Sequence, residues 1–376
     1  MLFIAKTFAG LEPLLNEELQ TLGARNCKPL SRSVQFEGDF ALLYKINYYS
    51  RLALRVLWQV DTFTFANNNQ FYEHIFNFPA EKYLASDGTM AVSATLAQTI
   101  FASPLFASVL TKDAICDRMR DRFGERPSVD KENPDVQFHL HVFKDRATLY
   151  LDSSGESLHK RGYKVSQHPA TLNEVTAAAM IKLSGWKKDC DFIDSMCGGG
   201  TLLIEAAMAA LNIPAGFYRQ HYGFFTWRNF DKELWRKTTD AAQIREDVPV
   251  DFYGYDISPR FLGMARTNVE QAELQDFIHL SKQDMFDSHP KRKPACIIIN
   301  PPYGERLEVE EINDFYQRIG DTWKSNYAGC TACLISSNAE AVKHVGLHPS
   351  KRADLFNGSL ACKFVKYELY SGSKKA

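Results

Sequence analysis

The most constraining feature of this sequence is an apolar run that stops at two consecutive prolines: residues 296–302 read Cys-Ile-Ile-Ile-Asn-Pro-Pro. An unbroken run of β-branched residues predicts a buried strand, and proline has no N–H with which to continue a strand ladder. Asn300 therefore follows the carboxyl end of a strand, where open α/β sheets bind their ligands. The prolines also hold the preceding residues extended, so the carbonyls of Asn300 and Pro301 are expected to point in fixed directions.

A loop of this kind suits recognition of a planar NH2 group. The Asn300 side-chain oxygen and the Pro301 carbonyl can accept its two hydrogens, and the ring of Tyr303 can stack on the plane that carries the amine. The simpler interpretation is a strand that ends in a Pro-Pro turn with a surface tyrosine. The position of the motif at a strand end favours the site, so we predict catalytic roles for Asn300, Pro301 and Tyr303.

Asn300-Pro301-Pro302-Tyr303 resembles the catalytic loop of S-adenosylmethionine-dependent amino-methyltransferases, which act on exocyclic amines of bases or, in one branch, on glutamine amides. The longer string through Gly304-Glu305-Arg306 resembles bacterial large-subunit (23S) ribosomal RNA guanine-N2 methyltransferases that carry a THUMP domain. This resemblance implies S-adenosyl-L-methionine as the cofactor and ribosomal RNA as the partner, with Arg306 among the residues that touch RNA. It also implies a Rossmann-like, seven-stranded methyltransferase domain preceded by α+β ferredoxin-like and THUMP domains.

The chain has 376 residues and a formal net charge of −1, from 44 Lys and Arg against 45 Asp and Glu. This length suits two or three domains that each bury a core. The balanced charge argues against a generally basic nucleic-acid binder, although phosphate contacts need only a local basic face.

No apolar run approaches the roughly eighteen residues needed to span a bilayer, and the apolar start is too short for a signal peptide. We therefore expect a soluble, cytoplasmic protein. Cys330 and Cys333 form a C-x-x-C without a second pair or a ligand-spaced histidine, so we expect small buried residues and no metal. Because the sequence ends at Ala376, we expect no second methyltransferase module of the kind fused to some relatives. The oligomeric state stays open.

The N-terminal part alternates short strands with helical patterns. Residues 1–60 predict a ferredoxin-like α/β layer, and residues 45–155 lie where the resembling family has its THUMP domain, with an interleaved boundary. The expected helix 105–123 carries Lys112, Arg118 and Arg122 among aspartates. Intrahelical ion pairs explain these charges as well as RNA contacts would, and Lys112 is kept as an RNA candidate.

Residues 154–170 form a polar joint that contains the densest basic cluster of the chain. A solvated linker is the simpler interpretation, but phosphate contact by Lys160, Arg161 and Lys164 is expected. The segment from Leu158 to Tyr163 is similar to the family's entry into the methyltransferase domain, here expected over residues 165–372. The resemblance implies that Tyr163 and Thr171 help to enclose the methionine end of the cofactor.

A predicted strand, three glycines and an apolar helix follow, as a nucleotide-type cofactor loop requires. Glycine spacing excludes a dinucleotide fingerprint and a P-loop. Compared with the usual family form, Ser195 replaces a proline and Gly199 replaces a serine. Loss of the proline at Ser195 is expected to loosen the loop. The expected cofactor residues in this loop are Asp194, Met196, Cys197, Gly198, Gly200 and Thr201.

Two further acids follow the next two predicted strands. Asp256 is positioned to accept both ribose hydroxyls of an adenosyl group, or to cap the helix after Ser258-Pro259. The resemblance places Asp284 beside the adenine amine. Between the glycine loop and Asp256, residues 212–250 are rich in aromatic and basic side chains. Most of these aromatics are expected in a core, although an RNA-facing lid that stacks bases has the same composition.

The leading hypothesis is therefore an RNA methyltransferase that modifies the guanine N2 amine in 23S ribosomal RNA. The alternatives are a transfer RNA guanine-N2 methyltransferase, an adenine-N6 DNA methyltransferase, a protein-glutamine methyltransferase and a catalytically inactive RNA-binding scaffold. The DNA and protein alternatives are disfavoured because no target-recognition segment follows Tyr303. The inactive scaffold would require loss of Asn300 or Asp256, and both are present.

Overall fold

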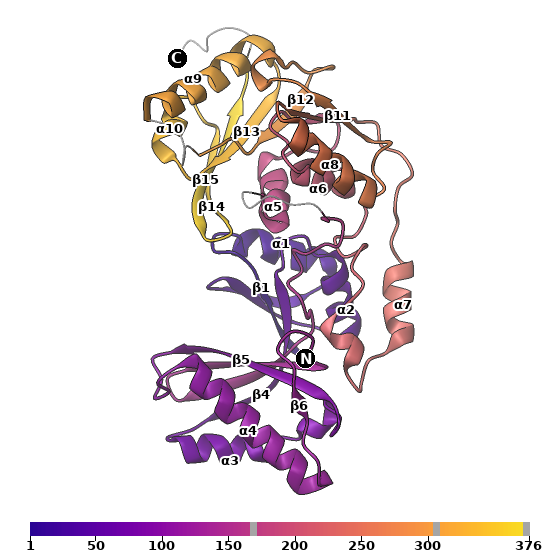
Figure 1. The fold of residues 1–376 in the computed structure, drawn as a ribbon, viewed down its shortest axis with the longest axis vertical. Helices are drawn as coiled ribbons and strands as arrows, with labels where there is room; N and C mark the ends of the chain where they lie inside the picture. Colours follow the sequence, from indigo (N-terminus) through magenta and orange to yellow (C-terminus); the bar gives the residue numbers. More distant parts are fainter. Residues whose placement is uncertain (166–170, 304–308, 371–376) are drawn as a thin grey trace. The chain divides into compact units, whose positions relative to one another are not determined.

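A computed structural model describes residues 1–165, 171–303 and 309–370. These residues form two compact units, drawn in Figure 1. Unit 1 comprises Met1–Thr7, Leu15–Leu158 and Arg219–Ala241. Unit 2 comprises Phe8–Leu14, His159–Tyr218 and Ala242–Ala376, apart from the ranges outside the description.

Unit 1 is built on one sheet, which in the described residues has eight strands in the order β2-β3-β1-β4-β8-β7-β5-β6. Its strands are β1 (Leu2–Lys6), β2 (Arg25–Leu30), β3 (Ser33–Glu37), β4 (Arg55–Thr64), β5 (Thr89–Ala97), β6 (Ser128–Val129), β7 (Val136–Phe143) and β8 (Arg146–Asp152). Its helices are α1 (Glu12–Leu22, in unit 1 from Leu15), α2 (Phe40–Tyr49), α3 (Asn68–Asn77), η1 (Ala80–Lys82), α4 (Pro104–Phe123), η2 (Gly223–Thr226) and α7 (Lys232–Asp240).

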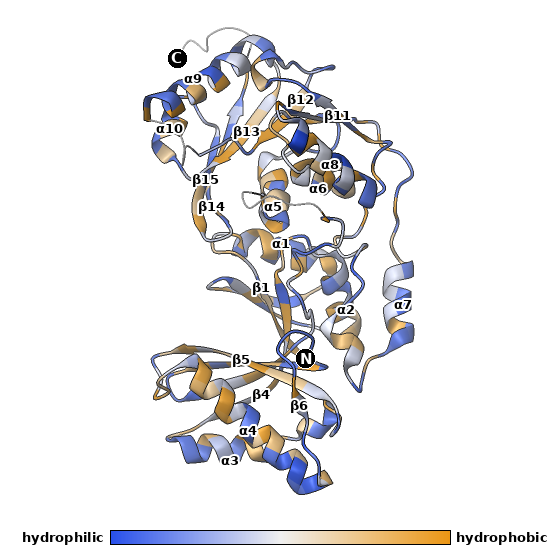
Figure 2. Ribbon diagram, viewed as in Figure 1, coloured by the Kyte–Doolittle hydropathy of each residue, from blue (hydrophilic) through white to orange (hydrophobic). Residues whose placement is uncertain are grey.

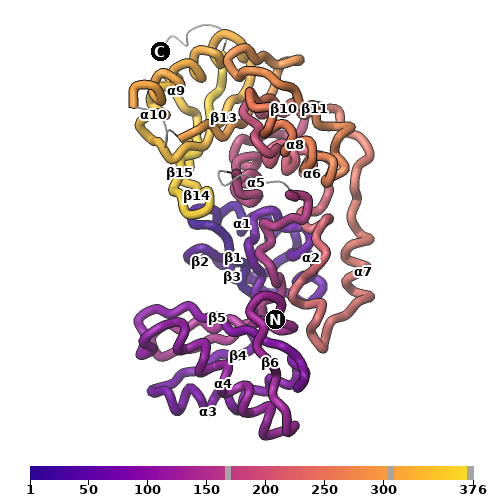
Figure 3. Tube along the Cα trace, in the orientation of Figure 1, coloured from indigo at the N-terminus to yellow at the C-terminus, as the bar shows by residue number. Residues whose placement is uncertain are grey.

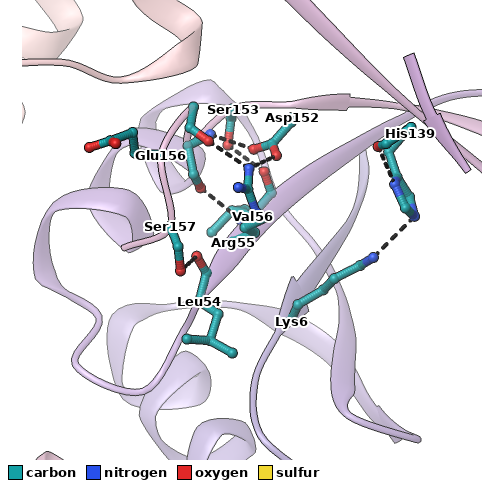
Figure 4. A network of polar contacts seen from close by, with 12 residues as sticks. Lys6, Leu54, Arg55, Val56, His139, Asp152, Ser153, Glu156 and Ser157 are labelled. Atoms are coloured by element: carbon teal, nitrogen blue, oxygen red, sulfur yellow. Dashed lines mark hydrogen bonds and ion pairs between the residues drawn. The ribbon is translucent and has the colours of Figure 1, made fainter. Parts of the chain in front are cut away.

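Strand β4 joins the two expected N-terminal domains into this single sheet. It pairs antiparallel with β1 on one side and with β8 on the other. Figure 4 shows the polar contacts across this seam. Arg55 of β4 forms an ion pair with Asp152 and donates to the Gly155 carbonyl at 2.5 Å, while Lys6 Nζ lies 3.0 Å from His139 Nε2. Because β4 begins where the ranges 1–60 and 45–155 overlap and continues beyond residue 60, its hydrogen bonds connect both ranges.

Buried and less buried side chains alternate along β7, so successive residues lie on opposite faces of this sheet. Val136, Phe138 and Leu140 are buried on the face where α4 packs against β5. His139 and His141 lie on the other face, and burial lowers the pKa of His139 to about 3, with a smaller effect from Lys6. His139 is therefore neutral at physiological pH. Strands β2 and β6 were not predicted, because β2 is mostly exposed and β6 has two residues, so neither shows an apolar period.

Unit 2 has a mixed sheet of seven strands within the described residues, in the order β11-β10-β9-β12-β13-β15-β14. Its strands are β9 (Asp191–Asp194), β10 (Phe252–Asp256), β11 (Ile278–Lys282), β12 (Ala295–Ile299), β13 (Thr331–Ser336), β14 (Lys351–Asn357) and β15 (Leu360–Glu368). The first five in the sheet order are parallel, and β15 and β14 form an antiparallel edge hairpin. The expected seven-stranded Rossmann-like sheet is confirmed.

Helices cover both faces of this sheet. They are α5 (Glu174–Ser184), α6 (Thr201–Ala210), α8 (Pro259–Gln271), η3 (Met285–Asp287), α9 (Val309–Asn326) and α10 (Ala339–Lys343). On one face, Tyr316 and Trp323 of α9 pack in the same buried cluster as Ile297 and Ile299 of β12. On the other, α5 contacts β12 and β13, and Cys296 faces Ser184 of α5. Figure 2 shows β13 coloured as hydrophobic, as expected of a strand covered on both faces.

The aromatic segment after α6 belongs to unit 1, because residues Arg219–Ala241 cluster with that unit. Helix α7 lies beside α2 (Figure 1 and Figure 3). Phe224 is fully buried with its ring centroid 4.6 Å from that of Tyr44, and Trp235 contacts the same tyrosine at 6.0 Å. These aromatic side chains form a core with the helix of the N-terminal layer. The alternative of a lid that stacks bases is therefore wrong for Phe224 and Trp235, which have their ring partners inside the protein.

Two expectations about cysteines and membranes can be compared with the described residues. Cys330 and Cys333 are free and buried, as expected for small residues at a strand start. Among the helices that are described, none combines the length and the apolar composition needed to cross a bilayer.

Truncating Phe224 tests its role in the unit 1 core. We expect Phe224→Ala to destabilise the protein by roughly 3 to 5 kcal/mol, because a large buried ring leaves a cavity. Chemical denaturation followed by tryptophan fluorescence measures this, since Trp235 and Trp227 report on unit 1. Exposed Phe217→Ala, in the same segment of the sequence but in unit 2, is the control and should change stability little. Equal stability of the two variants would contradict the assignment.

Candidate active site

The predicted site residues converge because their strands are neighbours in a parallel sheet. Asp194 ends β9, Asp256 ends β10, and Asn300 follows β12 directly. In the sheet order β10-β9-β12, the chain leaves β9 toward β10 on one side and later returns to β12 on the other. This reversal of strand order is the topological switch point at which open α/β sheets bind ligands. The sequence alone predicts strand ends, and the register brings them to one edge.

The glycine loop is held against β10 by backbone hydrogen bonds. The Cys197 N–H donates to the Tyr255 carbonyl at 2.9 Å, and the Gly198 N–H donates to Asp256 Oδ2 at 3.0 Å. Gly198 and Gly200 have φ of 52° and 81°, which other residues rarely adopt. A Cβ placed on Gly198 would meet no atom within 4 Å, so the loop faces open space there. The backbone can therefore approach a ligand closely.

Three acids at the strand ends share one local geometry. Each accepts the N–H two residues ahead: Asp194 from Met196 at 3.1 Å, Asp256 from Ser258 at 2.8 Å, and Asp284 from Phe286 at 3.0 Å. The cap of α8 is Ser258, so the alternative that Asp256 caps this helix is wrong. Asp256 is instead shared between the glycine loop and its own turn.

Asp194 has an unusual protonation state for an aspartate. Its carboxyl group is buried, and burial raises its pKa from 3.8 to about 8, with a smaller contribution from the charge of Asp256 and an opposing one from the Met196 N–H. The carboxyl group therefore holds a proton near neutral pH when no cation is nearby. A positive ligand group at this strand end would favour the ionised form.

Two charged side chains of the basic joint, Arg161 and Lys164, are held by ion pairs inside unit 2. Arg161 is 1% exposed and pairs with Glu205 of α6, whose carboxylate also accepts from the Tyr163 hydroxyl at 3.1 Å. Lys164 is 10% exposed and pairs with Glu174 of α5 at 2.8 Å. The expectation that Arg161 and Lys164 contact RNA is wrong, because their charges are used inside the protein. Tyr163 is fully buried and its hydroxyl donates to Glu205, and its contact with the cofactor stays a prediction.

The remaining basic and cofactor candidates differ in exposure and in their ion-pair partners. Lys160 is exposed, and Thr171 is half-buried just before α5. Lys112 is half-exposed and pairs with the adjacent Asp113. Arg118 and Arg122 pair with Glu81 of η1, so the predicted intrahelical pairing is wrong for both and the contact is tertiary. Arg306 lies outside the described residues.

The Asn-Pro-Pro-Tyr loop begins where the fully buried β12 ends. Asn300 is half-buried, Pro301 is buried and Pro302 is exposed. The Tyr303 hydroxyl donates to Asn300 Oδ1 at 2.7 Å, and its oxygen lies 4.0 Å from the Cys362 sulfur of β15. Burial, followed by the Cys362 contact, raises the pKa of Tyr303 well above its usual value, so the group is a neutral donor. This hydrogen bond fixes the position of the Asn300 side-chain oxygen. The second lone pair of that oxygen can still accept a hydrogen bond.

The family is decided by the comparison of this chain with known proteins. Residues 161–366 match the model described as the RMKL-like methyltransferase domain. Residues 65–152 match the THUMP domain, and residues 2–57 match the RlmL ferredoxin-like domain.

The chain belongs to the RMKL-like methyltransferase family. A protein of Synechocystis sp. named "Putative RNA methyltransferase slr0064" is 36% identical, and the match covers 98% of this chain and 97% of that protein. The ribosomal RNA large subunit methyltransferase K/L of Methylococcus capsulatus is 35% identical over 98% of this chain and 51% of its own length. The chain thus spans about half the length of the K/L relative.

A solved structure agrees with the fold over the whole chain. The crystal structure of SMU.472, described as "a putative methyltransferase complexed with SAH", superposes with a TM-score of 0.89. It is 28% identical, and the match covers 100% of this chain and 99% of that chain. The ferredoxin-like, THUMP and methyltransferase domains expected from the sequence are confirmed for this RMKL-like methyltransferase.

Two buried hydroxyls test whether the glycine loop of this methyltransferase fits an adenosyl cofactor. Ser195 Oγ and Thr201 Oγ1 are inaccessible and have no hydrogen-bond partner among the described residues. Buried hydroxyls normally find partners, so their position beside the glycine loop fits a polar ligand at this strand end. With the open side of Gly198, these groups form a donor-rich cradle. No cluster of His, Cys, Asp or Glu suited to a metal ion occurs in the described ranges.

Sequence reasoning missed residues that position this site from other elements. Asn268 of α8 is fully buried; its side-chain nitrogen donates to the Gly199 carbonyl at 3.0 Å and its oxygen accepts the Val165 N–H at 3.1 Å. Glu205 holds Arg161 and Tyr163 in the same way. A polar residue on the buried face of a predicted helix was the available signal, because such a group needs an internal partner. A buried polar residue shows that an internal partner is needed, but it does not show which residue that partner is.

Replacing Asp194 tests its raised pKa. Below pH 4 the carboxyl is protonated in both states; between about pH 4 and pH 8 the unfolded chain is ionised while the folded protein holds the proton, so this group makes folding less favourable as pH rises. Asp194→Asn stays neutral and keeps an oxygen for Met196. We expect its melting temperature, relative to the unmodified protein, to increase steadily from pH 5 to pH 8 in differential scanning fluorimetry without ligand. A difference independent of pH would contradict the raised pKa.

Proposed function

We propose that this chain is an S-adenosylmethionine-dependent methyltransferase that modifies the exocyclic N2 amine of a guanine in 23S ribosomal RNA. The observation that carries the proposal is Asn300 with its rigid diproline, which ends the strand beside the glycine loop. Relatives named as ribosomal RNA large subunit methyltransferases and the matched THUMP domain support RNA as the substrate.

Positioning and electrostatics supply most of the catalysis in this proposal. The exocyclic amine of guanine is nearly non-basic because its lone pair is delocalised into the ring. When Asn300 Oδ1 and the Pro301 carbonyl accept its two hydrogens, the nitrogen becomes more pyramidal and its lone pair is directed out of the plane. Asn300 has no basic group, so the proton lost after transfer passes to solvent.

When bound, S-adenosylmethionine would supply an electrophilic methyl on a sulfonium, so that the new N–C bond would form as the C–S bond breaks and sulfur keeps the electron pair. The glycine loop, with Asp194, Met196, Cys197, Gly198, Gly200 and Thr201, would hold this cofactor. Asp256 and Asp284 would bind its adenosine part. Burial keeps Cys197 a neutral thiol by raising its pKa, so no competing thiolate stands near the methyl donor.

The target guanine must leave its stack to reach the loop. Tyr303 would hold the extruded base with its ring while its hydroxyl keeps Asn300 oriented. Lys160, which is exposed, and Lys112 on the THUMP part would supply contacts with RNA phosphates. Deleting residues 1–155 is not a clean test of RNA binding, because it would strip Tyr44 from Phe224 and Trp235.

Asn300→Ala tests the mechanism. We expect methyl transfer to fall by at least about 100-fold, since a preorganised acceptor is lost. The affinity for S-adenosylmethionine, measured by calorimetry, should stay within twofold. Asn326→Ala, which removes a hydrogen bond to the Ser288 carbonyl elsewhere in unit 2, is the control and should retain turnover. Unchanged turnover of Asn300→Ala would remove the mechanism.

The substrate is tested with large-subunit ribosomal RNA, transfer RNA and duplex DNA, using labelled S-adenosylmethionine and mass spectrometry of the digested products. We expect N2-methylguanine in ribosomal RNA. Incorporation only into transfer RNA would favour the tRNA enzyme, and N6-methyladenine in DNA would overturn RNA as substrate.

Lys160→Gln tests phosphate contact at the surviving basic position. We expect weaker RNA binding and a salt dependence whose log–log slope falls by about one, as for loss of one phosphate contact. Filter binding across a salt series measures both. Lys187→Gln, an exposed lysine after α5, is the matched control. Identical slopes for Lys160→Gln and the unmodified protein would exclude the contact.

A further inference from the structure

A second set of hydrogen bonds holds the catalytic loop from behind. Tyr316 of α9 is fully buried, and its hydroxyl lies 3.3 Å from the Pro302 carbonyl and 2.7 Å from Ser336 Oγ at the end of β13. Asn338, which follows β13, donates from Nδ2 to the Tyr303 carbonyl at 3.3 Å. Two consecutive carbonyls of the loop are therefore bound by elements distant in sequence.

The direction of donation in this network follows from its end point. A carbonyl can only accept, so the single hydrogen of the Tyr316 hydroxyl points at Pro302. Ser336 must then donate to Tyr316. The Ser336 oxygen in turn accepts the backbone N–H of Asn338 at 3.1 Å. The series runs one way, from Asn338 through Ser336 and Tyr316 to the loop.

Asn338 is the common origin of both contacts with the loop. Its Oδ1 accepts the Ala341 N–H at 2.9 Å and caps α10, which fixes the orientation of its amide and turns Nδ2 toward Tyr303. Its backbone N–H donates to Ser336, the first hydrogen bond of the series that ends at the Pro302 carbonyl. One residue thus ties the start of α10 to both carbonyls.

We infer that Asn338 and Tyr316 are positioning residues for methyl transfer, acting through the loop without touching substrate. This inference rests on the proposed function. Because both prolines restrict the backbone, residues 300–303 move together, and binding the carbonyls of Pro302 and Tyr303 sets where Asn300 Oδ1 and the Pro301 carbonyl lie. The Tyr303 hydroxyl closes the loop onto Asn300. Acceptors displaced by a fraction of an ångström no longer direct the amine lone pair, which lowers turnover.

Cofactor binding should be insensitive to this network. The glycine loop is held by Asp256, Tyr255 and Asn268, whereas the diproline loop is held by Tyr316 and Asn338, so different residues support the two loops. A positioning role therefore predicts a fall in kcat with unchanged affinity for S-adenosylmethionine. A role in folding alone predicts lower stability without this selective effect.

Tyr316→Phe and Tyr327→Phe form a matched pair for the test. Tyr327 is also fully buried in the same apolar cluster, and its hydroxyl bonds Ser288 at 2.7 Å; among the described residues it has no bond to residues 300–303. Each variant keeps its ring and loses a buried hydrogen bond between a tyrosine hydroxyl and a serine hydroxyl. With methylatable RNA as substrate, we expect Tyr316→Phe to lower kcat at least tenfold, with KM for RNA and the cofactor Kd within twofold. Tyr327→Phe should keep kcat within twofold while losing a similar amount of thermal stability.

Asn338→Asp probes the other arm. Aspartate retains an oxygen to cap α10 and the backbone N–H to Ser336, but it cannot donate to Tyr303 and places a carboxylate oxygen against that carbonyl. We expect kcat to fall at least tenfold with the melting temperature nearly unchanged. The inference is overturned if the unmodified protein methylates RNA and both Tyr316→Phe and Asn338→Asp keep kcat within twofold, or if Tyr327→Phe loses as much. If the unmodified protein methylates no RNA, the proposed function fails instead.

Discussion

The site depends on one geometric constraint: parallel strands that start from the same direction must end at the same edge of their sheet. Strands β10, β9 and β12 are adjacent, so Asp256, Asp194 and Asn300 reach that edge together although more than a hundred residues separate the first part of the site from the last. Because the chain reverses its order between β9 and β12, no crossover helix fills the edge between these strands. A glycine loop from one side and a diproline loop from the other can then face a common ligand.

The polar groups at this edge are held by short local bonds and by longer ones from distant elements. Each strand-end aspartate turns its chain by accepting an N–H two residues ahead, which frees the backbone from the sheet ladder. Asn268 then anchors the glycine loop, and Asn338 with Tyr316 anchors the diproline loop. The two anchors come from different helices, so the two halves of the site are supported separately. This separation allows cofactor affinity and turnover to be altered independently.

Local charge and aromatic composition did not reveal which partners bury Arg161, Phe224 and Trp235. Arg161 stands in a basic, polar stretch that resembles a solvated linker, yet it is buried against Glu205, which lies 44 positions further along the chain. Phe224 and Trp235 stand among basic residues typical of an RNA surface, yet they complete a core with Tyr44. In both cases the partner that removes the side chain from solvent is remote in sequence. Burial of a charge requires such a partner, and no local pattern reveals it.

The sequence by itself determined the strand that ends at Asn300, the glycine loop after Asp194 and most of the helices, because apolar periodicity, proline and glycine act over a few residues. It also determined the family, through the Asn-Pro-Pro-Tyr motif and the residues around it. Only the tertiary structure decided that β4 joins two expected domains in one sheet, that residues 219–241 pack with unit 1, and that Tyr316 and Asn338 hold the catalytic loop. Those outcomes depend on contacts between residues far apart in the chain, whose geometry is set by strand order and packing.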